Sequence, residues 1–213
     1  MGLVQTIRAG RARRVMIAVA ALTIAAGNAP LAAQAPAGPA TWFSAWVGRF
    51  TDVGGFSDGD LAAFYRFDDA NAFGGGIHRR MGPGAVGGVD VLYGTTSYER
   101  FERDTGLLEG NGDAKLGSAL ASLRLAGGGG ILGIYLSAGA GVFAWDLDDE
   151  ELDDGWDLDF SFQIAAGLEY AVLPRARLFA EYGQWWVYHQ KDAAVEKNTA
   201  NHNLLRVGAR LGL

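Results

Sequence analysis

Apolar and polar side chains alternate with a period of two over long stretches of the chain after residue 40. Residues 157–170 give the clearest example, because their apolar side chains share one face of an extended strand: Leu158, Phe160, Phe162, Ile164, Ala166, Leu168 and Tyr170. A strand in a soluble sheet usually has about five or six residues, whereas a tilted strand that crosses a bilayer needs about nine to eleven. The length of this pattern therefore indicates a membrane-spanning strand.

The same alternation recurs up to the C-terminus. In the last segment Leu205, Val207 and Leu211 lie on one face, and Arg206 and Arg210 lie on the other. Arginines that face a dry protein core are costly, whereas arginines that face a polar barrel lumen are common. The pattern predicts seven strands, at residues 72–81, 85–98, 113–126, 131–146, 157–172, 176–190 and 202–213.

The first strand has two candidates, at residues 41–50 and 60–67. Bacterial single-chain barrels have an even number of strands, so only one of the two can be the eighth strand. The other segment would then belong to a loop or a plug. If 60–67 were the first strand, residues 68–71 would form the outer hairpin.

Short and long connections alternate along the chain. Three are tight, at Gly82–Gly84, Gly127–Gly130 and Leu173–Arg175, and three are long and polar, at 99–112, 147–156 and 190–201. Bacterial barrels have short periplasmic turns and longer outer loops. The sequence therefore predicts a closed antiparallel transmembrane β-barrel of about eight strands over residues 41–213, with a soluble secreted β-sandwich as the alternative.

The N-terminal segment is typical of a secretory signal peptide. Four arginines precede an apolar run from Val15 to Ala26, and small residues then lead to an A-x-A site that ends at Ala35. We expect cleavage after residue 35 and a short linker at 36–40. Removing 1–35 takes away four arginines and no acid, so the formal net charge falls from −6 to −10. Such an acidic chain is a poor partner for nucleic acid.

The alternating, glycine-rich strands and the C-terminal run Asn203–Leu213 resemble those of the small outer-membrane β-barrel superfamily, which includes the OmpA transmembrane domain, OmpW and opacity-type proteins. The final strand of that superfamily usually ends in an aromatic residue that the barrel-assembly machinery recognises, whereas this chain ends in Leu213. The resemblance implies integration in the bacterial outer membrane, contact with its lipid and lipopolysaccharide, and the barrel-assembly machinery as a partner during biogenesis. It leaves the oligomeric state open.

The long connection at 147–156 is strongly acidic. Calcium and magnesium prefer oxygen ligands, and crowded carboxylates repel one another without counter-ions. A weak divalent-cation site is therefore one interpretation of this loop, although it lacks the spacing of an EF-hand, and a solvated acidic loop is the other. The candidate ligands are Asp148, Asp149, Glu150, Glu151, Asp153 and Asp154. No other cofactor is expected.

Charged residues also fall on the expected inward faces of the strands. Opposite charges in a narrow lumen would pair, and they would plug and stiffen the barrel. A gated path for ions is the functional alternative, since barrels of this size are normally filled by their own side chains. The expected network consists of Arg124, Glu169, Arg177, Glu181, Arg206 and Arg210.

Catalysis is not expected. Small outer-membrane lipid A deacylases pair a histidine with a serine two residues further on, but His78, His189 and His202 are not followed by serine at that spacing. We expect a non-enzymatic barrel with a structural or surface-interaction role. A narrow channel for small ions or apolar solutes is the main alternative, and a lipid-modifying barrel enzyme is a further one.

Overall fold

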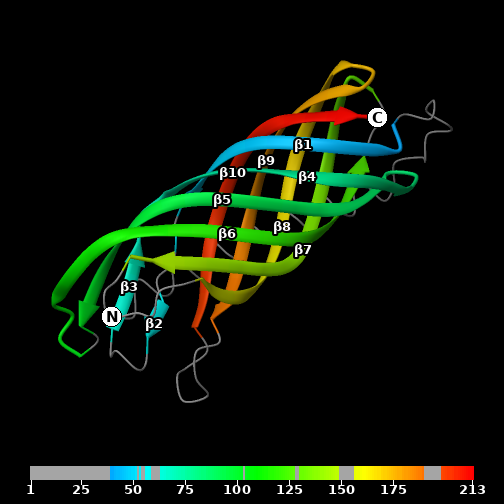
Figure 1. Cartoon of the computed structure of the whole chain (residues 1–213). Coiled ribbons are helices and arrows are strands. Elements are labelled where there is room, and N and C mark those ends of the chain that lie inside the picture. The colour runs from blue at the N-terminus through cyan, green and yellow to red at the C-terminus, as the bar shows by residue number, and fades with distance from the viewer. Residues whose placement is uncertain are drawn as a thin grey trace, which may run out of the picture. The chain divides into compact units, whose positions relative to one another are not determined.

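The computed structural model describes residues 39–51, 53, 56–58, 63–102, 104–127, 130–148, 156–189 and 198–213, and the expected signal peptide lies outside these ranges. Within them the chain forms ten antiparallel strands (Figure 1). Eight of them form the barrel: β1 (Thr41–Thr51), β4 (Ala70–Gly82), β5 (Ala85–Glu102), β6 (Leu108–Gly127), β7 (Leu132–Leu147), β8 (Asp157–Leu173), β9 (Ala176–His189) and β10 (Asn198–Gly212). The predicted fold class is confirmed.

The first and last strands pair with each other and close the sheet. β1 pairs with β10 on one side and with β4 on the other, so the barrel has no open edge along these strands. The register can be followed from Thr51 through each barrel strand in turn, and it returns to β1 at Thr41, ten residues away. A closed sheet with so large a stagger needs strongly tilted strands.

The segment 41–51 is the first barrel strand, and 63–67 has a different role. β3 (Ala63–Phe67) pairs with the far end of β5, and the short β2 (Phe56–Asp58) pairs with β3. Only Asp68 and Asp69 separate β3 from β4, and both strands pair with β5. The hairpin considered for residues 68–71 is therefore wrong. The chain does not reverse there, because β3 and β4 follow one another along the same side of β5.

The two ends of the barrel differ, and we call them the turn end and the loop end. The turn end carries the short connections and the C-terminus, and Gly84 there has a positive φ of 71°, which glycine adopts without strain. At the loop end β5 and β6 continue as paired strands, from Tyr98 opposite Gly112 to Phe101 opposite Leu108. The predicted long loop at 99–112 is therefore wrong in extent, since only 103–107 connect these strands.

Side chains alternate between the outer wall and the lumen, as the period of two predicts. Outward positions carry exposed apolar residues such as Val47, Phe73, Leu168 and Leu205, while inward positions are mostly buried. An apolar outer face and a polar or aromatic interior are the arrangement that suits a barrel in lipid. None of the described residues belongs to a helix long and apolar enough to cross a membrane.

Candidate functional site: the barrel lumen

The lumen is filled by two layers of side chains with different chemistry. Aromatic rings occupy the half nearer the loop end, and charged groups occupy the half nearer the turn end. We call them the aromatic layer and the ionic layer. The aromatic layer consists of Phe50, Tyr65, Phe67, Tyr98, Phe143, Trp145, Trp185 and His202. The ionic layer consists of His78, Asp90, Ser122, Arg124, Tyr135, Glu169, Arg177, Glu181, Arg206 and Arg210.

The rings of the aromatic layer pack mainly edge to face. Phe50 from β1 contacts Trp185 from β9 with the ring centroids 5.6 Å apart, and Phe143 from β7 contacts the same indole at 5.7 Å. His202 from β10 stacks on Phe143 at 5.8 Å. Rings from several strands therefore meet inside the barrel and obstruct it, and such pairs contribute beyond the apolar area they bury.

In the ionic layer, Glu181 and Arg206 form a buried ion pair. The Arg206 Nε donates a hydrogen bond to Glu181 Oε1 over 2.7 Å, and both residues are at most 6% exposed. Gln163 on β8 donates to the same oxygen at 3.4 Å, and Ser137 on β7 donates to the other at 3.5 Å. Arg206 also lies 4.0 Å from Asp90 on β5, so the network joins strands that are not neighbours.

Asp90 also lies beside His78 and Ser122. The His78 Nε2 is 3.0 Å from Asp90 Oδ2, and the Ser122 hydroxyl donates to that oxygen at 2.6 Å. In a serine-hydrolase triad the carboxylate holds one ring nitrogen and the hydroxyl approaches the other. Here both groups approach Nε2, with Ser122 Oγ at 3.4 Å, and Nδ1 is buried without a partner. This geometry therefore differs from that of a serine-hydrolase triad.

His78 is one of the three histidines considered from the sequence, but nothing in the sequence indicates that Ser122 lies beside it. The signal would have been register: Ser122 lies opposite Gly88, which in turn lies opposite His78. Three strands must be aligned before these residues become neighbours.

Glu169 is the centre of a second group of charges nearer the turn end. It forms ion pairs with Arg177 on the next strand and with Arg210 on β10, the latter at 3.1 Å. Arg210 also donates to the Tyr135 hydroxyl at 3.1 Å, and its guanidinium lies 3.8 Å from the centre of the Phe179 ring. Glu181 belongs to the neighbouring group with Arg206, so the ion pairs of the expected network fall into two groups.

Arg124 is the member of the expected network that has no acidic partner. It is 7% exposed, and its guanidinium lies over the Tyr135 ring at 5.3 Å. Among the described residues no carboxylate lies within 4.0 Å of it, and its side chain makes no hydrogen bond. It lines a polar cavity of about 20 Å³ together with Ser122, Ser137 and Arg210.

Two inward-facing glycines allow aromatic rings to lie against neighbouring strands. A Cβ on Gly167 would approach the Tyr135 ring to 2.3 Å, and a Cβ on Gly74 would approach the Trp46 ring to 2.5 Å. These distances are too short for any side chain, so the glycines are needed for the rings to lie flat. Trp46 in turn supports Arg206, whose guanidinium lies 5.0 Å from the centre of the indole.

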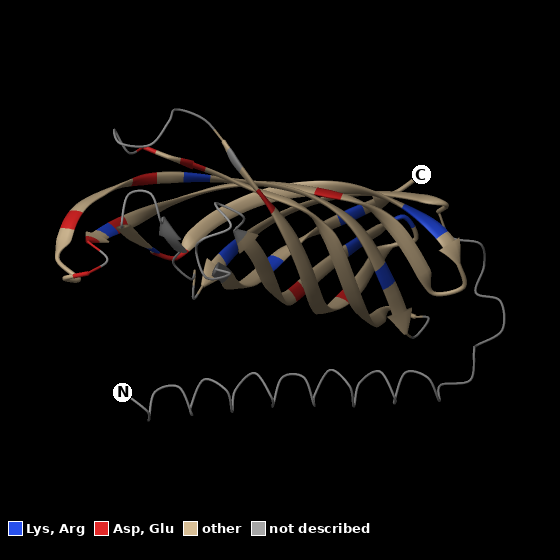
Figure 2. Ribbon diagram, turned by 90° about the horizontal axis from the view of Figure 1, so that it is seen from below, with Lys and Arg blue, Asp and Glu red and all other residues tan. Residues whose placement is uncertain are grey.

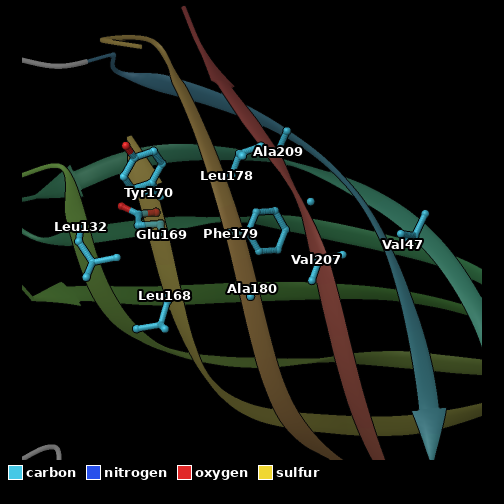
Figure 3. A pocket seen from close by; sticks show the side chains of 11 residues that line it. Val47, Leu132, Leu168, Glu169, Tyr170, Leu178, Phe179, Ala180, Val207 and Ala209 are labelled. Carbon is cyan, nitrogen blue, oxygen red and sulfur yellow. The ribbon is translucent and has the colours of Figure 1, made fainter. Parts of the chain in front are cut away.

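A larger hollow lies on the outer wall of the barrel (Figure 3). Its volume is about 650 Å³, and Leu132, Leu168 and Tyr170 lie on one side of it, across from Val47 and Val207. It forms because outward-facing Ala180 and Ala209 are smaller than their neighbours. A ligand pocket normally places a few polar groups among apolar ones. This hollow is almost wholly apolar, so it lacks the polar groups of a ligand pocket.

The candidate cation ligands lie almost entirely outside the described residues. Only Asp148 is described, and it is exposed, with its carbonyl oxygen accepting a hydrogen bond from the Tyr98 hydroxyl at 2.8 Å. Asp149, Glu150, Glu151, Asp153 and Asp154 fall in the range 149–155. Within the described ranges no group of three or more histidine or acidic side chains could hold a metal ion.

No protein-family model matches this sequence, and no curated protein matches it. Similar solved structures include neisserial surface protein A, with 18% identity over 84% of this chain and 100% of its own, and a TM-score of 0.48. OprG from Pseudomonas aeruginosa is 12% identical over 83% of this chain and 97% of its own, with a TM-score of 0.53. Ail from Yersinia pestis is 18% identical over 80% and 98%, with a TM-score of 0.43.

At these identities the similarity shows the fold alone, and the match to OprG, an outer membrane protein, is the one of the three strong enough to carry it. The chain has the fold of the small outer-membrane β-barrels, as its resemblance to the superfamily of OmpA, OmpW and opacity-type proteins implies.

Proposed function

We propose that this protein is a closed, non-enzymatic outer-membrane barrel that acts through the structure it presents at its loop end. The observation that carries the proposal is the filled lumen. Trp145, Trp185 and Phe143 are at most 2% exposed, and the polar cavity beneath them has a volume of about 20 Å³. That volume holds about one water molecule, so the lumen offers neither a wide aqueous path nor room for a substrate.

The loop end presents a rigid surface. β5 and β6 continue past the last pairs of β6 with β7, and β3 adds a third strand along β5. Acidic residues prevail along this projecting sheet (Figure 2), namely Glu99, Glu102, Asp104, Glu109 and Asp113. Leu107 and Leu108 are exposed at its tip. A paired sheet holds these groups in a fixed arrangement, which suits contact with a basic surface partner or with cations that bridge to lipopolysaccharide.

Export through the cleaved leader 1–35 and insertion by the barrel-assembly machinery are parts of the same proposal. In this proposal the turn end faces the periplasm and the loop end faces outward, because short turns and both termini lie on the periplasmic side of such barrels.

Conductance of the purified protein in a planar lipid bilayer tests the closed state. We expect a folded barrel, identified by faster migration on a gel before boiling, to give no discrete current steps. Steady steps of uniform size from the folded protein would contradict the proposal and would favour a channel gated by the pair of Glu181 and Arg206. The triple variant Phe50→Gly, Phe143→Gly and Trp185→Gly tests the aromatic layer separately, because the ionic layer still fills the lumen beneath it.

A further inference from the structure

Apart from His78, the ionic layer contains four arginines and three carboxylates. Its cations are Arg124, Arg177, Arg206 and Arg210, and its carboxylates are Asp90, Glu169 and Glu181. Each carboxylate pairs with an arginine or a histidine, and Arg124 is the arginine left over. A buried cation without a paired carboxylate is unfavourable, because burial removes the water that would solvate it.

The cavity beside Arg124 has a size that limits what could supply the missing charge. A volume of about 20 Å³ is a little more than the 10–15 Å³ or so that one water molecule requires by this measure. A halide ion is only slightly larger than water, so it fits, whereas sulfate and phosphate, with four oxygens each, do not.

The groups around the cavity can also donate hydrogen bonds. Arg124 and Arg210 contribute guanidinium N–H groups, and Ser44 and Ser137 contribute hydroxyl groups that make only long bonds, of 3.4 and 3.5 Å. The carboxylates of Asp90 and Glu181 also line the cavity, and they accept hydrogen bonds from Ser122 and Arg206. A hydroxyl rotates freely about its C–O bond, so both can turn toward an anion.

From this geometry we infer that the cavity beside Arg124 binds one small monovalent anion, chloride being the natural occupant, and that this anion completes the charge balance of the ionic layer. The anion is a structural ligand of the closed barrel. It therefore stabilises the folded protein without passing through it. If no anion binds, the proposal of a closed barrel is unaffected.

Unfolding of the full-length protein in detergent, refolded in different sodium salts at equal ionic strength, tests this inference. The folded fraction at each urea concentration is measured as the band that migrates faster on a gel before boiling. We expect chloride and bromide to raise this fraction up to a saturating concentration. Sulfate and gluconate should give only the effect of ionic strength that all four salts share. At a chloride concentration about ten times its dissociation constant, the ratio of folded to unfolded protein should rise about tenfold. Equal stability in all four salts would overturn the inference.

Two variants and a diffraction experiment make the test specific. Arg124→Gln should abolish the difference between chloride and gluconate, whereas Arg49→Gln, which removes an exposed arginine from the outer wall, should retain it. A halide effect that persists in Arg124→Gln would contradict the assignment.

Crystals of the unaltered protein grown in bromide offer an independent check if Arg124→Gln folds poorly. We expect an anomalous peak from bromide beside the Arg124 guanidinium. The absence of this peak would count against the site.

Discussion

The aromatic and ionic layers fill the same lumen in ways that respond differently to change. The stability of the aromatic layer depends on the volume and shape of its rings. The stability of the ionic layer depends on the pairing of opposite charges, since Glu169 and Glu181 are buried and held by ion pairs with arginines. A packed apolar layer therefore loses stability in proportion to the volume removed, whereas an ionic layer loses most of its stability at the first unpaired charge.

Breaking the central ion pair should have the largest effect. Glu181→Leu leaves Arg206 buried without its carboxylate, and we expect a loss of about 3–5 kcal/mol in the free energy of unfolding. Urea unfolding of the refolded barrel in detergent, followed by tryptophan fluorescence, measures this loss. The double variant with Arg206→Met should recover most of the stability, because both charges are then absent. A double variant no more stable than the single one would show that pairing is not the cause.

Shortening one ring of the aromatic layer should have an intermediate effect. Phe143→Leu keeps an apolar side chain but leaves a gap against Trp185 and His202, and we expect a loss of about 1–2 kcal/mol. The same unfolding assay applies, and Phe143→Ala should extend the loss with the volume removed. A loss for Phe143→Leu as large as that for Glu181→Leu would remove the contrast between the two layers.

An ion pair on the outer wall provides the smallest expected effect. Arg49 pairs with Asp69 at 3.1 Å, but the arginine side chain is 61% exposed. Water screens such a pair, so Arg49→Gln should cost less than about 1 kcal/mol. A cost comparable to that of Glu181→Leu would mean that burial does not explain the sensitivity of the lumen pair.

The alternation of side chains was enough to predict the barrel, but it did not assign Tyr65 and Phe67 to the lumen, because segment 60–67 was left between a first strand and a loop or plug. It locates Glu169, Glu181 and Arg206 on inward faces, because parity along each strand fixes the face. It could not divide Glu169 and Glu181 between two groups, since their partners depend on the stagger of ten residues around the barrel. The extension of β5 to Glu102 was also missed, because its polar and charged residues look like a loop when their partners are unknown.

The pairing of β1 with β10 also determines when the barrel can form. The fifteen residues of β10 are the last part of the sheet to be synthesised, and they close it against the first strand. Until they are made, two strands display backbone N–H and C=O groups that can pair with any other edge, which is a risk for aggregation. Pairing of β10 with β1 removes these edges, so the chain must be kept from pairing wrongly until the two strands meet.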